Sequence, residues 1–278
     1  MRTALLTIVA GLAGVMMATK PVPAHGPLFS PGPETIWKGG TEVTLGLHAE
    51  RATGAGEKER EYEVFLAGAY GITADWEIGI EIPYTRKEAG GDDSAGIGDI
   101  VLDTKYQFWK RDLPGAQYKA AVFLKTKLPT GDDDSRPRLG SGSTDVIAGL
   151  SAGYESRRWY WFGSGVYRAN TEGEGGLEKG DRQFLGAVGG IRPVLTEYDE
   201  PDTVLMIELN WERAGRDRLN GADLADTGGW ELFVSPVVWV TYRQFGFRGG
   251  VQIPIAGDLN GDRPDADYRG RIELIYHF

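Results

Sequence analysis

The chain ends with the stretch RIELIYHF, from Arg271 to Phe278. Every second residue from Ile272 onward is apolar, while Arg271 and Glu273 occupy alternate positions. Successive side chains of a β-strand point to opposite faces, so this pattern predicts a strand with one apolar face and one polar face. The alternation continues to the last residue, and we therefore ask what this strand pairs with and what its apolar face contacts.

The same alternation recurs along most of the chain, between turn sequences rich in Gly, Asp and Asn. Two segments are ambiguous, because one is aromatic on both faces and the other is rich in Gly. We include both and predict about twelve strands in a meander. They are centred on residues 43–47, 62–70, 76–84, 100–108, 118–128, 146–154, 159–168, 183–193, 205–211, 230–242, 245–255 and 272–278.

The second face of these segments is charged, as Glu42, Glu77 and Asp103 illustrate. Two architectures fit this arrangement. In a soluble β-sandwich, the apolar face forms the core and the charged face meets solvent. In a transmembrane β-barrel, the apolar face meets lipid and the charged face lines a wet lumen. Alternation alone does not distinguish the two architectures.

The lengths of the connectors favour the barrel. An outer-membrane barrel has long loops at one end and short turns at the other, a parity that a Greek-key sandwich does not predict. Along this chain long polar connectors alternate with shorter ones. The long connectors are residues 51–60, 85–98, 130–143, 169–180, 213–229 and 257–267, and the shorter ones are residues 71–75, 110–117, 155–158, 197–202 and 243–244.

Aromatic residues cluster at both ends of the predicted strands, as in the two aromatic girdles of a membrane barrel. Hydrocarbon does not tolerate unpaired backbone groups, so the strands must close on themselves. We therefore predict an all-β fold: a closed, antiparallel, up-and-down transmembrane β-barrel of about twelve strands. The RIELIYHF strand then pairs with the first strand, and its apolar face contacts lipid.

The first residues are typical of an export signal. Arg2 precedes the apolar run Ala4–Ala18, which is too short for a comfortable membrane-spanning helix, and Val22–Ala24 offers small residues before a cleavage point that leaves His25 as the first mature residue. The predicted organisation is a signal peptide at residues 1–24, a periplasmic N-terminal segment or plug at residues 25–40, and the outer-membrane β-barrel at residues 41–278.

Composition narrows the classes of function. The 278 residues include no cysteine, which excludes disulfides and thiolate metal sites. Removal of Arg2 and Lys20 with the signal peptide changes the formal net charge from −10 to −12, which argues against a nucleic-acid partner and a polybasic lipid anchor. We predict localisation in the bacterial outer membrane with both termini in the periplasm, because an even number of strands returns the chain to its starting side.

Strand parity assigns the charged face to the lumen, where charges set selectivity. Acidic residues dominate the first four strands, and basic residues are concentrated on the fifth strand and return on the last two. These charges form either a transverse field that orients polar solutes or a lattice that keeps the barrel hydrated. The predicted lumen-lining residues are Glu42, His48, Glu77, Glu81, Asp99, Asp103, Lys105, Lys119, Lys125, Lys127, Glu208, Glu212, Arg248, Arg269, Arg271 and Glu273.

Residues His25–Gly40 contain too much Pro and Gly for a helix or a central strand. The segment either folds back into the lumen as a plug or forms a periplasmic tether. His25 as a mature N-terminus would offer an amine and an imidazole to copper, and Asp258–Asp267 partly resembles a Ca²⁺ loop. Arg263 and Arg269 stand where such a loop needs Gly and Glu, and we assign no metal ligand.

Three stretches in the middle of the chain resemble one known family. They are GIGDIVLDTKYQFW (Gly96–Trp109), FLKTKLPTGDDD (Phe123–Asp134) and LGSGSTDVIAGLSAGY (Leu139–Tyr154). They resemble the outer-membrane family named for the meta pathway of phenol degradation, over roughly residues 40–278. The resemblance implies a transporter-like β-barrel for aromatic or hydrophobic solutes. This family has no shared set of solute-binding residues to transfer to the chain.

The predicted function is passive passage of small solutes, hydrophobic or aromatic ones included, with no cofactor. The expected partners are outer-membrane lipids and lipopolysaccharide, a small-molecule solute, and the barrel-insertion machinery, since the terminal Phe278 resembles its recognition signal. The alternatives are a structural or cation-binding barrel without transport, or a lipid-acting outer-membrane enzyme. We predict no enzyme, because His48 and His277 face the lumen by parity and the chain has no G-x-S-x-G sequence.

Overall fold

In the computed structural model, residues 26–54, 57–197, 200–261 and 265–278 are described. The predicted signal peptide at residues 1–24 and the candidate copper ligand His25 lie outside the described residues. None of the described residues belongs to a helix that is long and apolar enough to cross a membrane.

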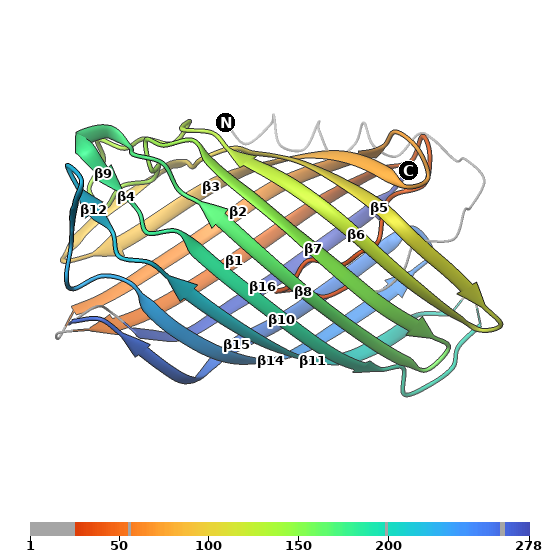
Figure 1. Ribbon diagram of the computed structural model, residues 1–278. Coiled ribbons are helices and arrows are strands. Elements are labelled where there is room, and N and C mark those ends of the chain that lie inside the picture. The colour runs from red at the N-terminus through yellow and green to blue at the C-terminus, as the bar shows by residue number, and fades with distance from the viewer. Residues whose placement is uncertain (1–25, 55–56, 198–199, 262–264) are drawn as a thin grey trace, which may run out of the picture.

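Twelve long antiparallel strands form the wall of a closed β-barrel, which confirms the predicted fold (Figure 1). Each strand pairs with its neighbours along the meander. The strands are β1 (Thr41–Gly54), β2 (Glu57–Gly71), β3 (Trp76–Ala89), β5 (Val101–Leu113), β6 (Ala116–Lys127), β7 (Asp145–Ser156), β8 (Trp159–Ala169), β10 (Arg182–Ile191), β11 (Asp202–Ala214), β14 (Gly229–Tyr242), β15 (Phe245–Leu259) and β16 (Asp265–His277).

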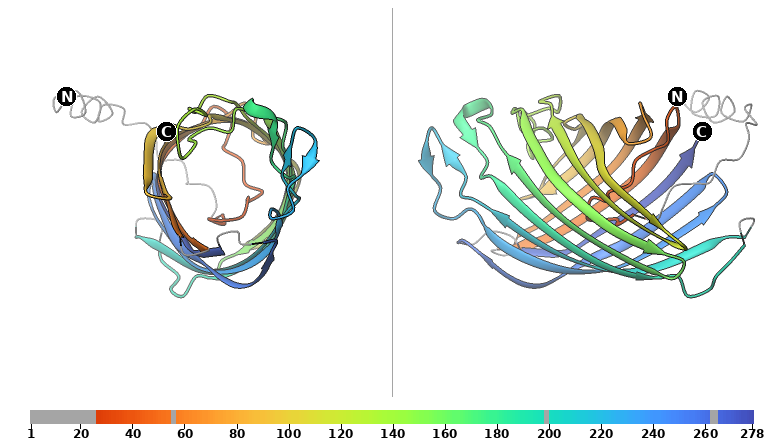
Figure 2. Two further views of the ribbon diagram at one scale, coloured as in Figure 1. Left: turned by 90° about the vertical axis from the view of Figure 1, so that its left-hand side faces the viewer. Right: turned by 45° about the vertical axis from the view of Figure 1, so that its right-hand side comes forward.

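The last strand closes the cylinder. β16 pairs antiparallel with β15 on one side and with β1 on the other, where Leu45 lies opposite Leu274 and Leu47 opposite Ile272. The end view in Figure 2 shows the resulting ring of strands. The RIELIYHF stretch is therefore paired along both edges, which leaves no open strand edge to expose to hydrocarbon.

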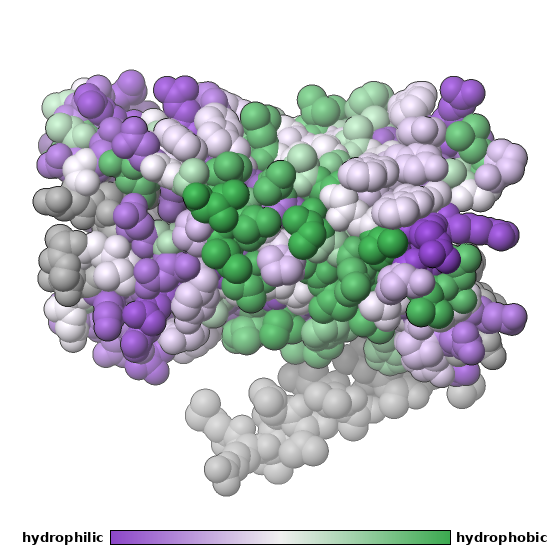
Figure 3. Space-filling model, turned by 90° about the horizontal axis from the view of Figure 1, so that it is seen from below, coloured by the Kyte–Doolittle hydropathy of each residue, from purple (hydrophilic) through white to green (hydrophobic). Residues whose placement is uncertain are grey.

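The apolar side chains point outward. Leu45, Leu66 and Leu274 are 49%, 52% and 55% exposed, whereas the inward-facing Phe65 and Glu273 are 2% and 1% exposed. On the face seen in Figure 3, apolar residues gather across the middle of the molecule and hydrophilic residues predominate toward its ends. A soluble sandwich would bury these leucines, so the two faces have the orientation of a membrane barrel.

The prediction of long loops is partly wrong, because several strands continue past the apolar band into the predicted connectors. The predicted loop at residues 85–98 instead extends β3 to Ala89 and continues as β4 (Asp92–Ile97), with Gly90 and Gly91 at positive φ in the turn. Both faces of such an extension meet water, so the sequence has no alternation there to reveal a strand. β4 and β5 pair with the two halves of β3 and occupy one position in the wall.

Other predicted loops also contain strand. β1 and β2 pair as far as Gly54 and Glu57, and β15 and β16 extend to Leu259 and Asp265. A small separate sheet is formed by β9 (Leu177–Glu178), β12 (Arg218–Leu219) and β13 (Ala222–Asp223), next to the 3-10 turn η1 (Glu174–Gly176). The long-loop end is therefore more ordered than the composition of the connectors suggested.

Candidate functional site: the barrel lumen

The N-terminal segment (residues 26–40) runs through the interior of the barrel. Figure 2 shows it in red inside the ring of strands. Its last residues are fixed at the short-turn end, where the Gly39 N–H donates to the Gly71 carbonyl at 2.7 Å and the Gly71 N–H donates to the Gly40 carbonyl at 3.0 Å. From there the segment contacts β3 and β5 on one wall and β11 and β15 on the other.

Two wall carboxylates accept hydrogen bonds from the backbone of the N-terminal segment. The Ile36 N–H donates to Glu77 Oε2 at 2.8 Å. On the opposite side, the Leu28 N–H donates to Glu208 Oε1 at 2.6 Å, and the Phe29 N–H donates to Glu208 Oε2 at 3.2 Å. Glu77 and Glu208, both predicted from strand parity, thus meet the same segment from two walls.

Wall donors bind the carbonyl groups of the N-terminal segment. Lys105 Nζ donates to the Glu34 carbonyl at 2.8 Å and also pairs with Glu77 at 3.0 Å. Arg248 Nη1 donates to the Pro27 carbonyl at 2.8 Å. The segment is Pro- and Gly-rich and forms no ladder with the wall, so its backbone groups depend on these side chains for hydrogen bonds.

Glycines in the wall leave room for the segment. A Cβ atom added to Gly186 of β10 would lie 3.0 Å from Ser30 Cβ, and one added to Gly153 of β7 would lie 3.1 Å from Pro33 Cγ. Asn210 Nδ2 donates to Ser30 Oγ at 2.7 Å from the neighbouring strand β11. The segment therefore contacts the wall at van der Waals distance through its central residues.

Part of the lumen wall is apolar, which the sequence analysis missed. We call this surface the lumen patch; it comprises Tyr160, Phe162, Val188, Val204, Met206 and Val237. Leu28 lies within this buried cluster and Phe29 packs against it. The signal was present but weak, because β8 and β11 carry apolar residues at both parities and give no contrast between faces.

Water-sized space remains on both sides of the N-terminal segment. A cavity of about 380 Å³ is bounded by residues 26–32 and by wall residues that include Asp103, Lys125 and Trp239. A vestibule of about 860 Å³ opens at the short-turn end, bordered by Trp37, Gln107 and Arg192 among others. Thr35 lines both spaces, so both of them border the segment.

Five predicted lumen residues have no ion-pair partner within 4.0 Å among the described residues: His48, Glu81, Asp103, Lys125 and Glu208. Asp103 and Lys125 lie opposite each other in register on β5 and β6, and both line the 380 Å³ cavity. Their charges are therefore available to a solute or ion in this cavity, unlike those of the paired residues described next.

Strands β15 and β16 present a network of charges. Glu273, which is 1% exposed, pairs with Arg271 at 2.6 Å and with Arg248. Arg269 pairs with Glu212 of β11 at 2.9 Å and with Glu50 at 3.1 Å. The network neutralises buried charge within the wall. This arrangement agrees with the alternative in which the lumen charges form a lattice that keeps the barrel hydrated.

Asp99 and Lys127 lie at the long-loop end. Lys127 Nζ is 3.1 Å from Asp99 Oδ2 and 2.6 Å from Asp145 Oδ2. Burial alone would raise the pKa of Asp99, but N–H groups of Ser141 and Gly131 and the nearby Lys127 hold it below its usual value. Asp99 thereby fixes the connector between β6 and β7 to the residues that precede β5. The ion pair of Lys127 with Asp99 contributes to this contact.

The remaining predicted residues lie nearer the short-turn end or on β1. Glu42 Oε2 is 2.8 Å from His277 Nε2 across the β1–β16 pair. Lys119 pairs with Glu155 at 3.4 Å. His48 is half-buried on β1 opposite Arg271. Glu42 and His277 are therefore in direct contact, while His48 lies six residues further along β1.

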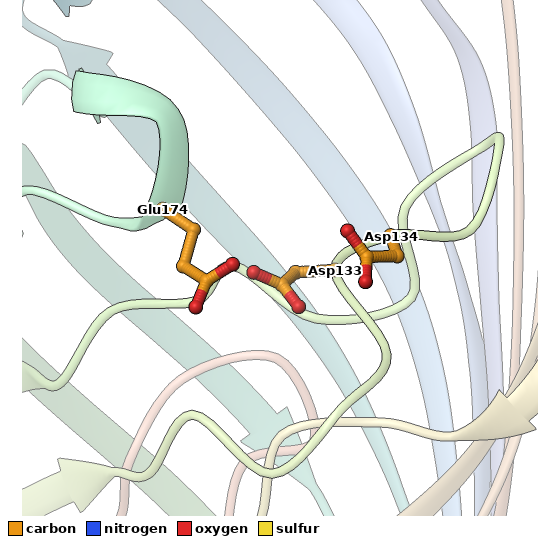
Figure 4. A group of neighbouring side chains, drawn as sticks. All are labelled: Asp133, Asp134 and Glu174. Atoms are coloured by element: carbon orange, nitrogen blue, oxygen red, sulfur yellow. The ribbon is translucent and has the colours of Figure 1, made fainter.

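Among the residues that the structure describes, the outer connectors hold one compact group of carboxylates. Asp133, Asp134 and Glu174 bring one oxygen each to within 4.8 Å of one another (Figure 4). Exposed carboxylates often gather in this way without a cation, and we assign no metal to them. In the stretch Asp258–Asp267, residues 262–264 lie outside the described residues, while Asp258 and Leu259 belong to β15 rather than to a loop.

Comparison with known proteins gives a family and a fold. Residues 24–204, more than half of the chain, match the model of the family described as "Putative MetA-pathway of phenol degradation". An outer membrane channel from Pseudomonas putida F1 superposes with a TM-score of 0.72 at 16% identity, covering 90% of this chain and 100% of that one. The beta domain of the Bordetella autotransporter BrkA superposes with a TM-score of 0.53 at 11% identity, covering 86% and 99%. No curated protein matches the sequence of this chain.

Proposed function

Because this chain belongs to the family described as "Putative MetA-pathway of phenol degradation", we propose that it is an outer-membrane channel for passive passage of small solutes. The barrel has a lipid-facing apolar surface and a lumen lined by charges, which is the arrangement of a membrane channel. Both termini lie in the periplasm in this proposal, residues 1–24 are removed on export, and Phe278 is read by the barrel-insertion machinery. Lipopolysaccharide and phospholipids surround the wall.

One observation carries the proposal: the N-terminal segment lies inside the barrel and borders both the 380 Å³ cavity and the 860 Å³ vestibule. The contacts between segment and wall are individual hydrogen bonds and side-chain packing, without strand pairing. Each such hydrogen bond involves a charged side chain and contributes about 1.5–3 kcal/mol. None of them belongs to a strand ladder, so the segment can leave without disrupting the ladders of the barrel. The segment acts as a plug, and its displacement opens the passage.

The solutes are small and include hydrophobic or aromatic ones. The lumen patch supports this choice, because an apolar surface inside a charged bore attracts apolar solutes once it is uncovered. Charged residues around the patch keep the remainder of the passage wet. No step in this passage requires a cofactor or a covalent intermediate.

Liposomes test the proposal against its alternatives. Purified mature protein is reconstituted in liposomes loaded with a small sugar and a phenolic dye, and release of both is followed together with the lipid composition. Release of solute with unchanged lipids is the expected result. Fatty-acid release would support the enzyme alternative, and tight liposomes with the intact and the segment-deleted chain would leave a structural barrel.

Ion selectivity is expected to depend on Lys125. Replacement of Lys125 with Glu reverses one unpaired charge in the cavity, where the effective dielectric constant is lower than in water, and we expect the cation-to-anion permeability ratio to rise about threefold or more. The measurement is the reversal potential across a planar bilayer in a salt gradient. Lys58→Glu makes the same charge change in the outer extension of β2 and serves as control. Equal cation-to-anion permeability ratios for the Lys125→Glu and Lys58→Glu variants would show that the ions do not pass through this cavity.

A further inference from the structure

Glu208 is a carboxylate whose hydrogen bonds come from the N-terminal segment. It is 0% exposed, and among the described residues no cation forms an ion pair with it. Two donors from the segment are the consecutive N–H groups of Leu28 and Phe29. Burial of a carboxylate is unfavourable unless donors reach it, so the wall at Glu208 is built to receive donors from the lumen side.

Glu208 borders the lumen patch. In the strand register it lies opposite Val188 of β10 and Ser235 of β14, and Met206 precedes it on the same face of β11. The patch is covered by Leu28 and Phe29, the residues whose N–H groups reach Glu208. The wall thus combines an apolar surface with a buried carboxylate at its edge, and Leu28 and Phe29 of the segment contact both.

On the basis of the proposed channel function, we propose that the lumen patch and Glu208 form a solute-binding site, which the N-terminal segment occupies as an internal ligand. The solute class is an aromatic ring that carries one neutral O–H or N–H donor. The ring replaces the Leu28 and Phe29 side chains on the patch, and the donor replaces their N–H groups at Glu208.

Binding of the solute and seating of the segment are mutually exclusive, so the solute shifts the population toward the displaced segment and opens its own passage. Solutes with a carboxylate are disfavoured, since their charge would face that of Glu208. Aromatic hydrocarbons fill the patch but leave Glu208 without a donor, which costs binding free energy.

Cross-linking measures the competition directly in the full mature chain. The chain has no native cysteine, so Ser30→Cys with Gly186→Cys provides the sole thiol pair, between the segment and β10. The rate of disulfide formation with diamide reports how often the segment is seated. We expect saturating 4-ethylphenol to slow this rate about fivefold or more. Ethylbenzene partitions more strongly into detergent but lacks the donor, and should slow the rate less than about twofold.

Variants separate the roles of Glu208 and of the barrel as a whole. In the same double-cysteine chain, Glu208→Gln should remove most of the retardation by 4-ethylphenol, while Glu63→Gln, which alters an inward carboxylate on β2, should preserve it. Equal retardation by 4-ethylphenol and ethylbenzene overturns the proposal. So does retardation by 4-ethylbenzoate that matches the retardation by 4-ethylphenol.

Equilibrium dialysis of 4-ethylphenol with the unmodified chain is the second measurement. Saturable binding that Glu208→Gln abolishes supports the site, and the absence of saturable binding overturns it.

The outcomes distinguish this inference from the channel itself. If deletion of residues 26–33 opens a conducting pore but 4-ethylphenol leaves cross-linking unchanged, the binding site is wrong and the channel stands. If 4-ethylphenol slows cross-linking but the deletion variant does not conduct, the site stands and the channel is wrong.

Discussion

Deletion of Gly26–Pro33 raises the single-channel conductance of the refolded mature chain about threefold or more, because the narrowest part of the passage is removed. These eight residues carry the contacts to Glu208, Arg248 and the lumen patch, whereas Ile36, which contacts Glu77, and the Gly39–Gly71 hydrogen bond remain. The measurement is conductance in a planar bilayer at fixed salt concentration and voltage.

The deletion also has an energetic cost that is smaller than the stability of the closed strand ladder. Loss of the buried Leu28 side chain costs about 1.5–3 kcal/mol, and Glu208 loses its backbone donors. We expect the barrel to fold, which a heat-dependent gel shift in detergent verifies. A matched control replaces the eight residues with a Gly/Ser linker of the same length. If a folded deletion variant conducts no better than the intact chain, the N-terminal segment does not limit the passage.

A disulfide between Ser30→Cys and Gly186→Cys closes the channel in the second experiment. The Cβ of Ser30 lies 3.0 Å from the position of a Cβ at Gly186, and disulfides need about 3.8 Å, so a shift of under about 1 Å accommodates the bond. We expect oxidation to reduce solute flux through the double variant about tenfold or more, because the segment can no longer leave.

Addition of dithiothreitol to the same liposomes should restore the flux. Each single-cysteine variant under the same oxidant is the control, since neither can form an intramolecular bond. Flux that is insensitive to oxidation in a chain with a verified disulfide would show that solutes pass beside a seated segment, or by another route.

The fold was predictable because the membrane imposes a strong pattern on the sequence. Apolar residues at every second position gave ten strands and their orientation, and two ambiguous segments completed the predicted twelve. The parity of the connectors distinguished the barrel from a sandwich. Beyond the apolar band this pattern ends, and residues 85–98 were therefore assigned to a loop although they extend a hairpin.

The site was only partly predictable, for two physical reasons. Parity gives the direction of a side chain but not its partner, so Lys125, which faces the open cavity, and Lys127, which is bound between Asp99 and Asp145, looked equivalent. The contact between Leu28 and Glu208 spans 180 residues, and no local pattern encodes such a contact. The N-terminal composition did not distinguish a plug from a tether, because both require an irregular segment.

The reactivity of two cysteines tests most directly the assignment on which the account depends, that apolar side chains face lipid and the alternate side chains face a wet bore. Leu66 and Ala69 lie on opposite faces of β2; Leu66 is 52% exposed on the outside, and Ala69 lines the cavity. In proteoliposomes, a charged, water-soluble methanethiosulfonate reagent should modify Ala69→Cys rapidly and Leu66→Cys hardly at all, because a thiol in hydrocarbon does not ionise. Rapid modification of Leu66→Cys with protection of Ala69→Cys would contradict the account.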